Sequence, residues 1–176
     1  MKPENVRITV TALSLSAAAF IGLVVHEGYT DRAVIPTQGD VPTLGFGSTA
    51  HEDGRRVRMG ERTDPVNALK KAHAHITKEE QRFRSSLPGA HLTQAEYDLY
   101  IDWVYQYGMG AWHKPKSPRT WLLRGEHVAA CDALLHWRFV GNYDCSTTIN
   151  GQPNKRCWGV WTRQQERHKT CLEAQP

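Results

Sequence analysis

The sequence lacks the long runs of basic residues that are typical of nucleic-acid-binding segments. Its 176 residues carry 22 Lys and Arg against 18 Asp and Glu, a net charge of +4, yet the basic residues form no run of five or six. Because such runs are typical of segments that bind nucleic acid, the sequence disfavours a nucleic-acid partner. The positive excess fits either an ordinary solvated surface or attraction to an anionic polymer.

Cysteine is absent from residues 1–130, and the four cysteines, Cys131, Cys145, Cys157 and Cys171, all lie in the C-terminal part. None is spaced as C-x-x-C, which disfavours a zinc site. We predict no metal site and no cofactor. An even number fits two disulfides, provided that the protein reaches an oxidising compartment. Of three possible pairings we expect the nested one: Cys131 with Cys171, joining two predicted helices, and Cys145 with Cys157, closing a loop. Four reduced thiols are the alternative.

Charge is also absent from residues 8–25, which follow Lys2 and Arg7. This run is at the short limit for a membrane-spanning helix, and it contains many hydroxyl-bearing and small residues, so insertion into a bilayer should be marginal. A cleavable signal peptide, with Ala17–Ala19 as the small residues of the cleavage site, is one interpretation. A permanent anchor is another.

Prolines and glycines prevent a long helix in residues 29–47. Short strands are the natural prediction there, over residues 33–36 and 43–46, with a third near residues 56–58. Together they form a small antiparallel sheet. Helices are predicted for the remainder, because capping residues precede apolar positions at helical spacing. The expected helices are residues 65–85, from 94 to about 110, 118–125, 127–138 and 162–173.

One carboxylate stands out among these elements. Glu27 follows the apolar run after one residue, His26, and a turn-rich passage then leads to Thr43-Leu44-Gly45-Phe46-Gly47. An acid at the end of a helix, followed by a glycine-bearing hairpin, can line a cleft with a proton donor and with hydroxyl or backbone groups. We therefore treat this stretch as the candidate active site.

The stretch resembles the active-site segment of the phage-type lysozymes, which are muramidases that serve as endolysins. In that family a Glu-Gly pair precedes a Thr-Ile-Gly-Tyr-Gly segment, which corresponds to Glu27-Gly28 and residues 43–47 here. Residues 104–110 are similar to the family's F-x-Y-N-x-G-x-G motif, and the likeness extends over residues 26–172. The resemblance implies an α+β, lysozyme-like fold for residues 26–176, with a small N-terminal β-sheet lobe, a larger helical lobe and the cleft between them.

Residue roles follow from the same resemblance. Glu27, expected in apolar surroundings, would be the general acid, and Thr43 would orient the attacking water. The family's middle residue is usually Asp or Cys, but the family spacing places Pro36 there. Asp40 is the favoured substitute for it, and Thr37 is the alternative. Gly45 and Gln106, the latter in place of the family's Asn, are the candidate substrate-binding residues.

The implied activity is hydrolysis of the β-1,4 bond between N-acetylmuramic acid and N-acetylglucosamine in peptidoglycan, by a monomer that lyses the bacterial host. Some endolysins of this family carry a signal-anchor-release segment, which is a third interpretation of residues 1–25: tethering through residues 8–25 in the inner membrane, then release into the periplasm. The absence of cysteine from residues 1–130 excludes thiol exchange as the trigger. A lytic transglycosylase, and a non-catalytic protein that binds the wall or disrupts membranes, are alternatives.

Overall fold

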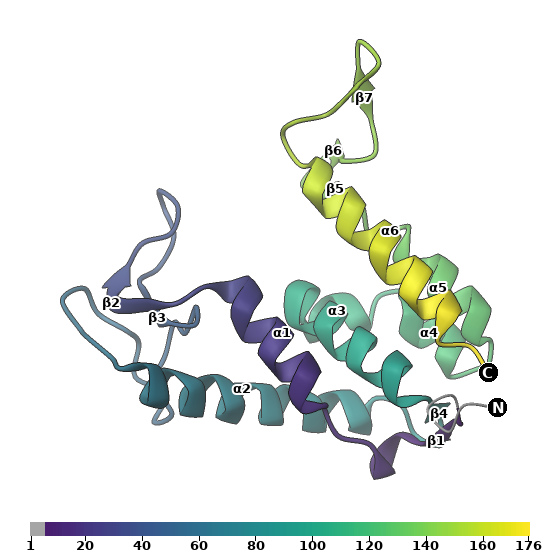
Figure 1. The fold of residues 1–176 in the computed structure, drawn as a ribbon, viewed down its shortest axis with the longest axis horizontal. Coiled ribbons are helices and arrows are strands. Elements are labelled where there is room, and N and C mark those ends of the chain that lie inside the picture. The colour runs from purple at the N-terminus through teal and green to yellow at the C-terminus, as the bar shows by residue number, and fades with distance from the viewer. Residues whose placement is uncertain (1–5) are drawn as a thin grey trace. The chain divides into compact units, whose positions relative to one another are not determined.

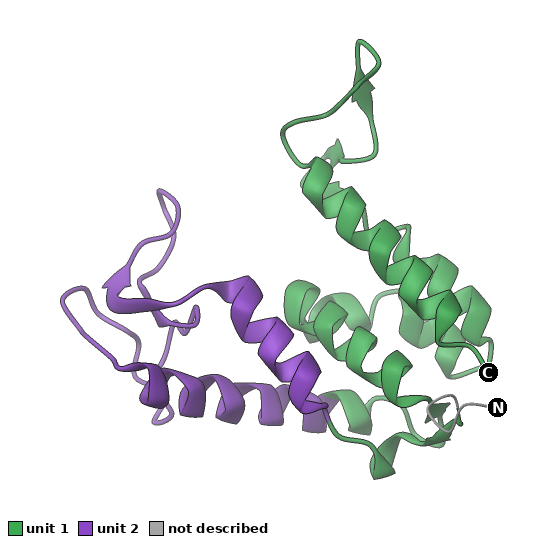
Figure 2. Cartoon of the chain, viewed as in Figure 1, with its two compact units in different colours: residues 1–14, 83–176 green, residues 15–82 purple. Residues whose placement is uncertain are grey.

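The computed structural model describes residues 6–176, which fall into two compact units (Figure 2). Unit 1 combines the described residues up to Ser14 with Phe83–Pro176, and unit 2 is Leu15–Arg82. The chain therefore starts in unit 1, forms unit 2 and returns. Strands occur only as short antiparallel pairs among helices, so the expected α+β class is confirmed (Figure 1).

Unit 2 contains helix α1 (Ala17–Glu27), strands β2 (Thr30–Val34) and β3 (Thr43–Gly45), and most of helix α2 (Pro65–Ser85). Ser16 caps α1 by accepting a hydrogen bond from the Ala19 amide. β2 and β3 are antiparallel, with Thr30 opposite Gly45 and Val34 opposite Thr43. Both predicted strands are present, but the first runs from Thr30 to Val34 rather than over residues 33–36. The helix beginning at Pro65 is confirmed, and residues 50 and 56 form an isolated bridge near the expected third strand.

The helices of unit 1 are α3 (Gln94–Trp112), α4 (Pro118–Leu122), α5 (His127–Leu134) and α6 (Trp158–Glu173). The capping box predicted at Thr93 and Glu96 is present. Gly108, at φ +79°, interrupts α3 with non-helical geometry. An aromatic core lies around α3, and its Trp103, Trp112 and Phe83 side chains are fully buried. The ring centroids of Phe83 and Trp112 are 5.1 Å apart, and those of Trp103 and Trp112 are 5.7 Å apart.

Both disulfides form in unit 1 with the expected pairing. Cys131 is bonded to Cys171, which joins α5 to α6, and Cys145 is bonded to Cys157. Between α5 and α6 the chain forms the strand pairs β5 (Phe139–Val140) with β6 (Tyr143–Asp144), and β7 (Thr148–Ile149) with β8 (Gln152–Pro153).

Three predicted helix limits were wrong. α4 ends at Leu122 rather than at residue 125, and α5 ends at Leu134 rather than at residue 138, because Arg138 turns to pair with Asp144 of β6. α6 begins at Trp158, four residues before the predicted cap at Thr162. The Thr162 hydroxyl donates to the Trp158 carbonyl, so Thr162 lies one turn inside the helix instead of capping it.

The uncharged run is not one continuous element. β1 (Ile8–Thr9) pairs with β4 (His91–Leu92), the short 3-10 helix η2 (Val10–Ala12) follows, and α1 begins only at Ala17. Val10 and Leu13 are buried. Within the part of the chain that the structure describes, no helix combines the length and apolar character needed to cross a membrane.

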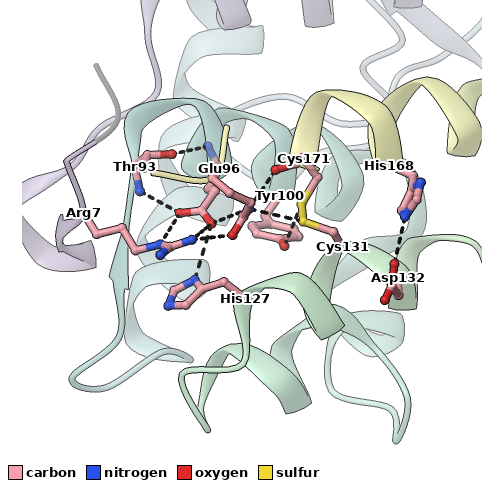
Figure 3. Close-up of a disulfide and its surroundings, with 10 residues drawn as sticks. Arg7, Thr93, Glu96, Tyr100, His127, Cys131, Asp132, His168 and Cys171 are labelled. Atoms are coloured by element: carbon pink, nitrogen blue, oxygen red, sulfur yellow. Dashed lines mark hydrogen bonds and ion pairs between the residues drawn. A yellow bond between two sulfur atoms is a disulfide. The ribbon is translucent and has the colours of Figure 1, made fainter. Parts of the chain in front are cut away.

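A buried ion pair fixes the start of the chain to unit 1 (Figure 3). The Glu96 carboxylate is fully buried and accepts two hydrogen bonds from Arg7, at 3.0 and 2.8 Å, while also accepting from the Thr93 amide. His127 Nδ1 lies 3.4 Å from Glu96 Oε1. Burial raises the pKa of Glu96, but the contacts with His127, Arg7 and Thr93 outweigh it and lower the pKa to about 2.

Candidate active site

Glu27 is the last residue of α1. Gly28 ends the helix at φ +69°, and its amide donates to the Val25 carbonyl at 3.3 Å. A glycine is suited to this position because a side chain is strained at positive φ. Glu27 itself is exposed, and so is Val25 beside it. The apolar surroundings that we expected for this carboxylate are therefore not supplied by its own helix.

The Glu27 carboxylate lies against the backbone of Gly47. A Cβ atom placed on Gly47 would come within 2.7 Å of Glu27 Oε2 and 3.7 Å of Cδ, and the residue has φ +73°. The positive φ favours glycine, and an added Cβ would displace the Glu27 carboxylate, which is the flexible end of its side chain. This contact joins the two halves of the stretch predicted from the sequence, and it makes Gly47 the residue that limits where the carboxylate can lie.

Gly45 has a different neighbour. It is buried at φ +68°, and a Cβ atom there would lie 2.8 Å from the Cβ of Ala68 in α2. The close approach of β3 to α2 is sufficient to explain why this position is glycine. The predicted contact of Gly45 with substrate stays a prediction.

Thr43 lies opposite Val34 at the end of the strand pair. Its hydroxyl donates to the Val34 carbonyl at 3.3 Å, and the residue is half-buried. Since the proton is used in this bond, the Oγ1 lone pairs are left to accept a hydrogen bond from a water molecule or a sugar hydroxyl. The register of the hairpin therefore determines what Thr43 can do.

Thr37 and Asp40 stand at the two ends of one turn in the loop between β2 and β3. The Asp40 amide donates to the Thr37 carbonyl at 2.9 Å, and Gly39 supplies the positive φ of +92° that the turn requires. Both side chains are exposed. The structure keeps these two candidates together and leaves the choice between them to experiment.

Two aromatic residues beside the site were not predicted. The rings of Tyr29 and Phe46 are 5.4 Å apart, and the Tyr29 hydroxyl donates to the Thr63 carbonyl. Partial desolvation, together with Asp31 and Asp64, raises the pKa of Tyr29. Their place in the sequence could have indicated that they lie near the site, since Tyr29 directly follows Gly28 and Phe46 directly precedes Gly47. They place an apolar pair between the two segments that meet at Glu27.

Gln106 belongs to α3 in unit 1. Its Oε1 accepts a hydrogen bond from Arg167 at 2.6 Å, and Arg167 is itself buried and paired with Asp102. The side chain is exposed, so its amide N–H groups can donate to a ligand. Within residues 6–176, no three His, Cys, Asp or Glu side chains are grouped so as to hold a metal ion.

The model of one protein family, described as phage lysozyme, matches residues 24–158, which include Glu27, Thr43 and the whole hairpin. This chain belongs to the phage lysozyme family. It is accordingly a glycoside hydrolase of the lysozyme type that acts on peptidoglycan. A search of curated proteins found no match.

Solved structures similar to this lysozyme confirm the fold. The endolysin of Escherichia coli O157:H7 phage FAHEc1 has a TM-score of 0.72 at 21% identity, covering 93% of this chain and 97% of that one. A mutant of P22 lysozyme gives 0.69 at 22%, covering 91% and 99%. The muramidase domain of SpmX from Asticaccaulis excentricus gives 0.66 at 18%, covering 90% and 97%. The lysozyme-like fold predicted for this chain is therefore confirmed.

Proposed function

We propose that this lysozyme hydrolyses the β-1,4 bond between N-acetylmuramic acid and N-acetylglucosamine, and that it lyses the bacterial host at the end of a phage cycle. The observation that carries the proposal is the Glu27 carboxylate at the end of α1, lying against Gly47. Hydrolysis needs an acid to protonate the leaving glycosidic oxygen, and the Glu27 carboxyl group in its protonated form can supply that proton from its position beside Gly47.

The second group must hold a water molecule on the opposite face of the sugar. Thr43 can accept a hydrogen bond from that water, because its own proton is donated to Val34. Asp40 would act as a general base and take the proton from the water, whereas Thr37 could only orient it. We favour Asp40 for this reason, with Thr37 as the alternative.

Glu27→Gln tests the proposal. The amide keeps the size of the side chain but supplies no acidic proton, so cleavage of purified peptidoglycan, followed as new reducing ends, should fall by about 10²- to 10⁴-fold. The matched control is Glu52→Gln, because Glu52 is an exposed carboxylate on a loop of the same unit. If lysis of permeabilised cells continues at the original rate in Glu27→Gln, the protein does not act as a glycosidase through this residue.

Asp40→Asn and Thr37→Val separate the two candidates for the second group. If Asp40 is the base, its substitution should lower turnover far more than that of Thr37; the reverse order would assign the role to Thr37. Product masses complete the test. Hydrolysis adds one water to the cleaved strand, and products lighter by one water, with an anhydro-sugar end, would identify a lytic transglycosylase instead.

We also propose that residues 8–25 tether the protein to the inner membrane before release, and that the released monomer acts in the periplasm. Support comes from the uncharged run, which Arg7 precedes, and from the many small and hydroxyl-bearing residues that make insertion marginal. Fractionation before and after a membrane uncoupler tests this: full-length protein should move from membrane to soluble fraction. Thr11→Leu, at an exposed position of the folded chain, should delay that movement. A shortened soluble product would indicate a signal peptide.

A further inference from the structure

Two consecutive β-hairpins stand off from the helices of unit 1, between α5 and α6 (Figure 1). We call residues 139–157 the double hairpin. In the first hairpin Val140 lies opposite Tyr143, and in the second Ile149 lies opposite Gln152. Most of its residues are exposed, so it adds little to the core of the unit.

Covalent and polar contacts nevertheless give the double hairpin a defined structure. The Cys145–Cys157 disulfide closes the second hairpin at its base. Arg138 donates to both oxygens of Asp144 at 3.1 Å, and the buried Asn154 accepts from the Arg156 amide at 3.0 Å. A short peptide of this length would not be stable as hairpins in water without such constraints. The fold therefore maintains an exposed element that its own core does not require.

The exposed side chains of the double hairpin include large apolar ones. Their exposed fractions are 49% for Phe139, 48% for Val140, 47% for Tyr143 and 62% for Ile149. Isolated exposed apolar residues are common, but a group of them on one small element is typical of an interaction surface. Exposed Asn142, Thr148 and Gln152 alternate with them in the sequence.

The charge of this element is positive. Residues 139–157 contain two basic residues, Lys155 and Arg156, and one acidic residue, Asp144, whose carboxylate is already bonded to Arg138. Lys155 and Arg156 are exposed, and neither forms an ion pair with any described residue. The Arg156 guanidinium lies over the Tyr143 ring, 3.6 Å from its centroid. Stacking fixes the plane of the guanidinium and leaves its edge N–H groups free to donate to a carboxylate.

We propose that the double hairpin, which belongs to unit 1, is an accessory binding surface for peptidoglycan in addition to the predicted catalytic residues, which belong to unit 2. Tyr143 and Phe139 would pack against the apolar faces of sugar rings, and Lys155 and Arg156 would pair with carboxylates of the stem peptides. The inference rests on the proposed function, which makes peptidoglycan the substrate. The polar residues among the apolar ones suit a polymer of hydroxyl, amide and carboxylate groups better than they suit lipid tails.

Binding is measured by co-sedimentation with purified sacculi, in the Glu27→Gln background so that the polymer stays intact. Arg156→Glu and Lys155→Glu should each weaken binding about threefold to tenfold, the range for losing one exposed charge contact and gaining a repulsion. The matched control is Arg124→Glu, because Arg124 is an exposed arginine over the ring of Trp121, at 5.4 Å, outside the double hairpin. The control should change binding less than twofold. Unfolding midpoints should agree among all three variants.

Two further arms identify what is bound. Sacculi from which an amidase has removed the stem peptides should bind the unsubstituted Glu27→Gln protein more weakly and abolish the difference between Arg156→Glu and Arg124→Glu. Vesicles rich in anionic lipid should bind Arg156→Glu and Arg124→Glu equally, because the two variants carry the same net charge. Equal binding of Arg156→Glu and Arg124→Glu to intact sacculi, or a loss at vesicles only, would overturn the proposal. Failure of the hydrolase proposal would be seen separately, as full activity of Glu27→Gln.

Discussion

The two units differ in where they place buried side chains and where they place reactive ones. Among the described residues, the largest fully buried side chains, such as Trp103, Trp112 and Tyr97, all belong to unit 1, as do both disulfides. In unit 2 the hairpin core is a small cluster of Ala33, Leu44 and Val57. Beside this cluster, the partly exposed Glu61 pairs with Arg55 and lies 2.7 Å from His51 Nε2.

This division indicates that stability and chemistry are carried by different parts of the chain. An active site must expose polar groups and positive-φ backbone, which contribute little to stability, whereas burial of apolar rings contributes most of it. Variants in unit 1 should therefore change the free energy of unfolding, and variants around Glu27 should change turnover. The four predictions below test this comparison, from the largest expected effect to the smallest.

Replacing both Cys131 and Cys171 by Ala should give the largest loss of stability. The bridge closes a chain segment with a sequence separation of 40, and chain-entropy arguments give about 4 kcal/mol for a loop of this size. The same change at Cys145 and Cys157, with a separation of 12, should cost about 3 kcal/mol. Denaturant unfolding measures both. If the order were reversed, the double hairpin would carry more of the stability of unit 1 than we infer.

Acid should destabilise unit 1 through Glu96. Its pKa is about 2 in the folded chain against an ordinary value of 4.5, so the folded state binds fewer protons than the unfolded state. The resulting stability, about 3 kcal/mol, is fully present above pH 4.5 and is lost as the pH falls toward 2. Unfolding measured across this range should follow that course, and Glu96→Gln should flatten it. An unchanged slope in that variant would contradict the assignment.

Gly45→Ala should destabilise unit 2 by about 2 to 3 kcal/mol, from positive-φ strain and from overpacking. The new Cβ would lie 2.8 Å from that of Ala68, which cannot rotate away. Thermal unfolding measures the loss. Gly54→Ala is the control, since Gly54 has φ +83° with nothing within 4 Å of the added Cβ, so it reports backbone strain alone.

Gly47→Ala should change activity more than stability. Its Cβ would displace the Glu27 carboxylate, and a misplacement of about 1 Å can lower turnover by up to about 10²-fold. The unfolding midpoint should fall by no more than in Gly54→Ala, because the obstacle is the flexible end of a side chain rather than packed backbone. Equal activity of the two variants would show that Gly47 does not position the acid.

Local patterns in the sequence predicted much of the fold. The Thr93 capping box, the helix start at Pro65 and the glycine-broken hairpin are all encoded within a few residues, so they could be recognised without tertiary information. Limits that depend on distant partners were predicted less well. α5 ends early because Arg138 pairs with Asp144, and α6 starts early, next to the Cys145–Cys157 bridge.

At the candidate site, too, features encoded within a few residues could be predicted from the sequence, whereas contacts between distant segments could not. The sequence by itself determined that Glu27 ends an apolar helix and that a Thr-Leu-Gly-Phe-Gly segment follows, whereas it left three pairings open for the four cysteines and the structure decided among them. Only the tertiary structure decided that Gly47 rather than Gly45 meets the carboxylate and that Arg7 neutralises Glu96. The physical reason is that capping and turn geometry are short-range properties of the chain, whereas burial, register and ion pairing depend on which distant segments come into contact.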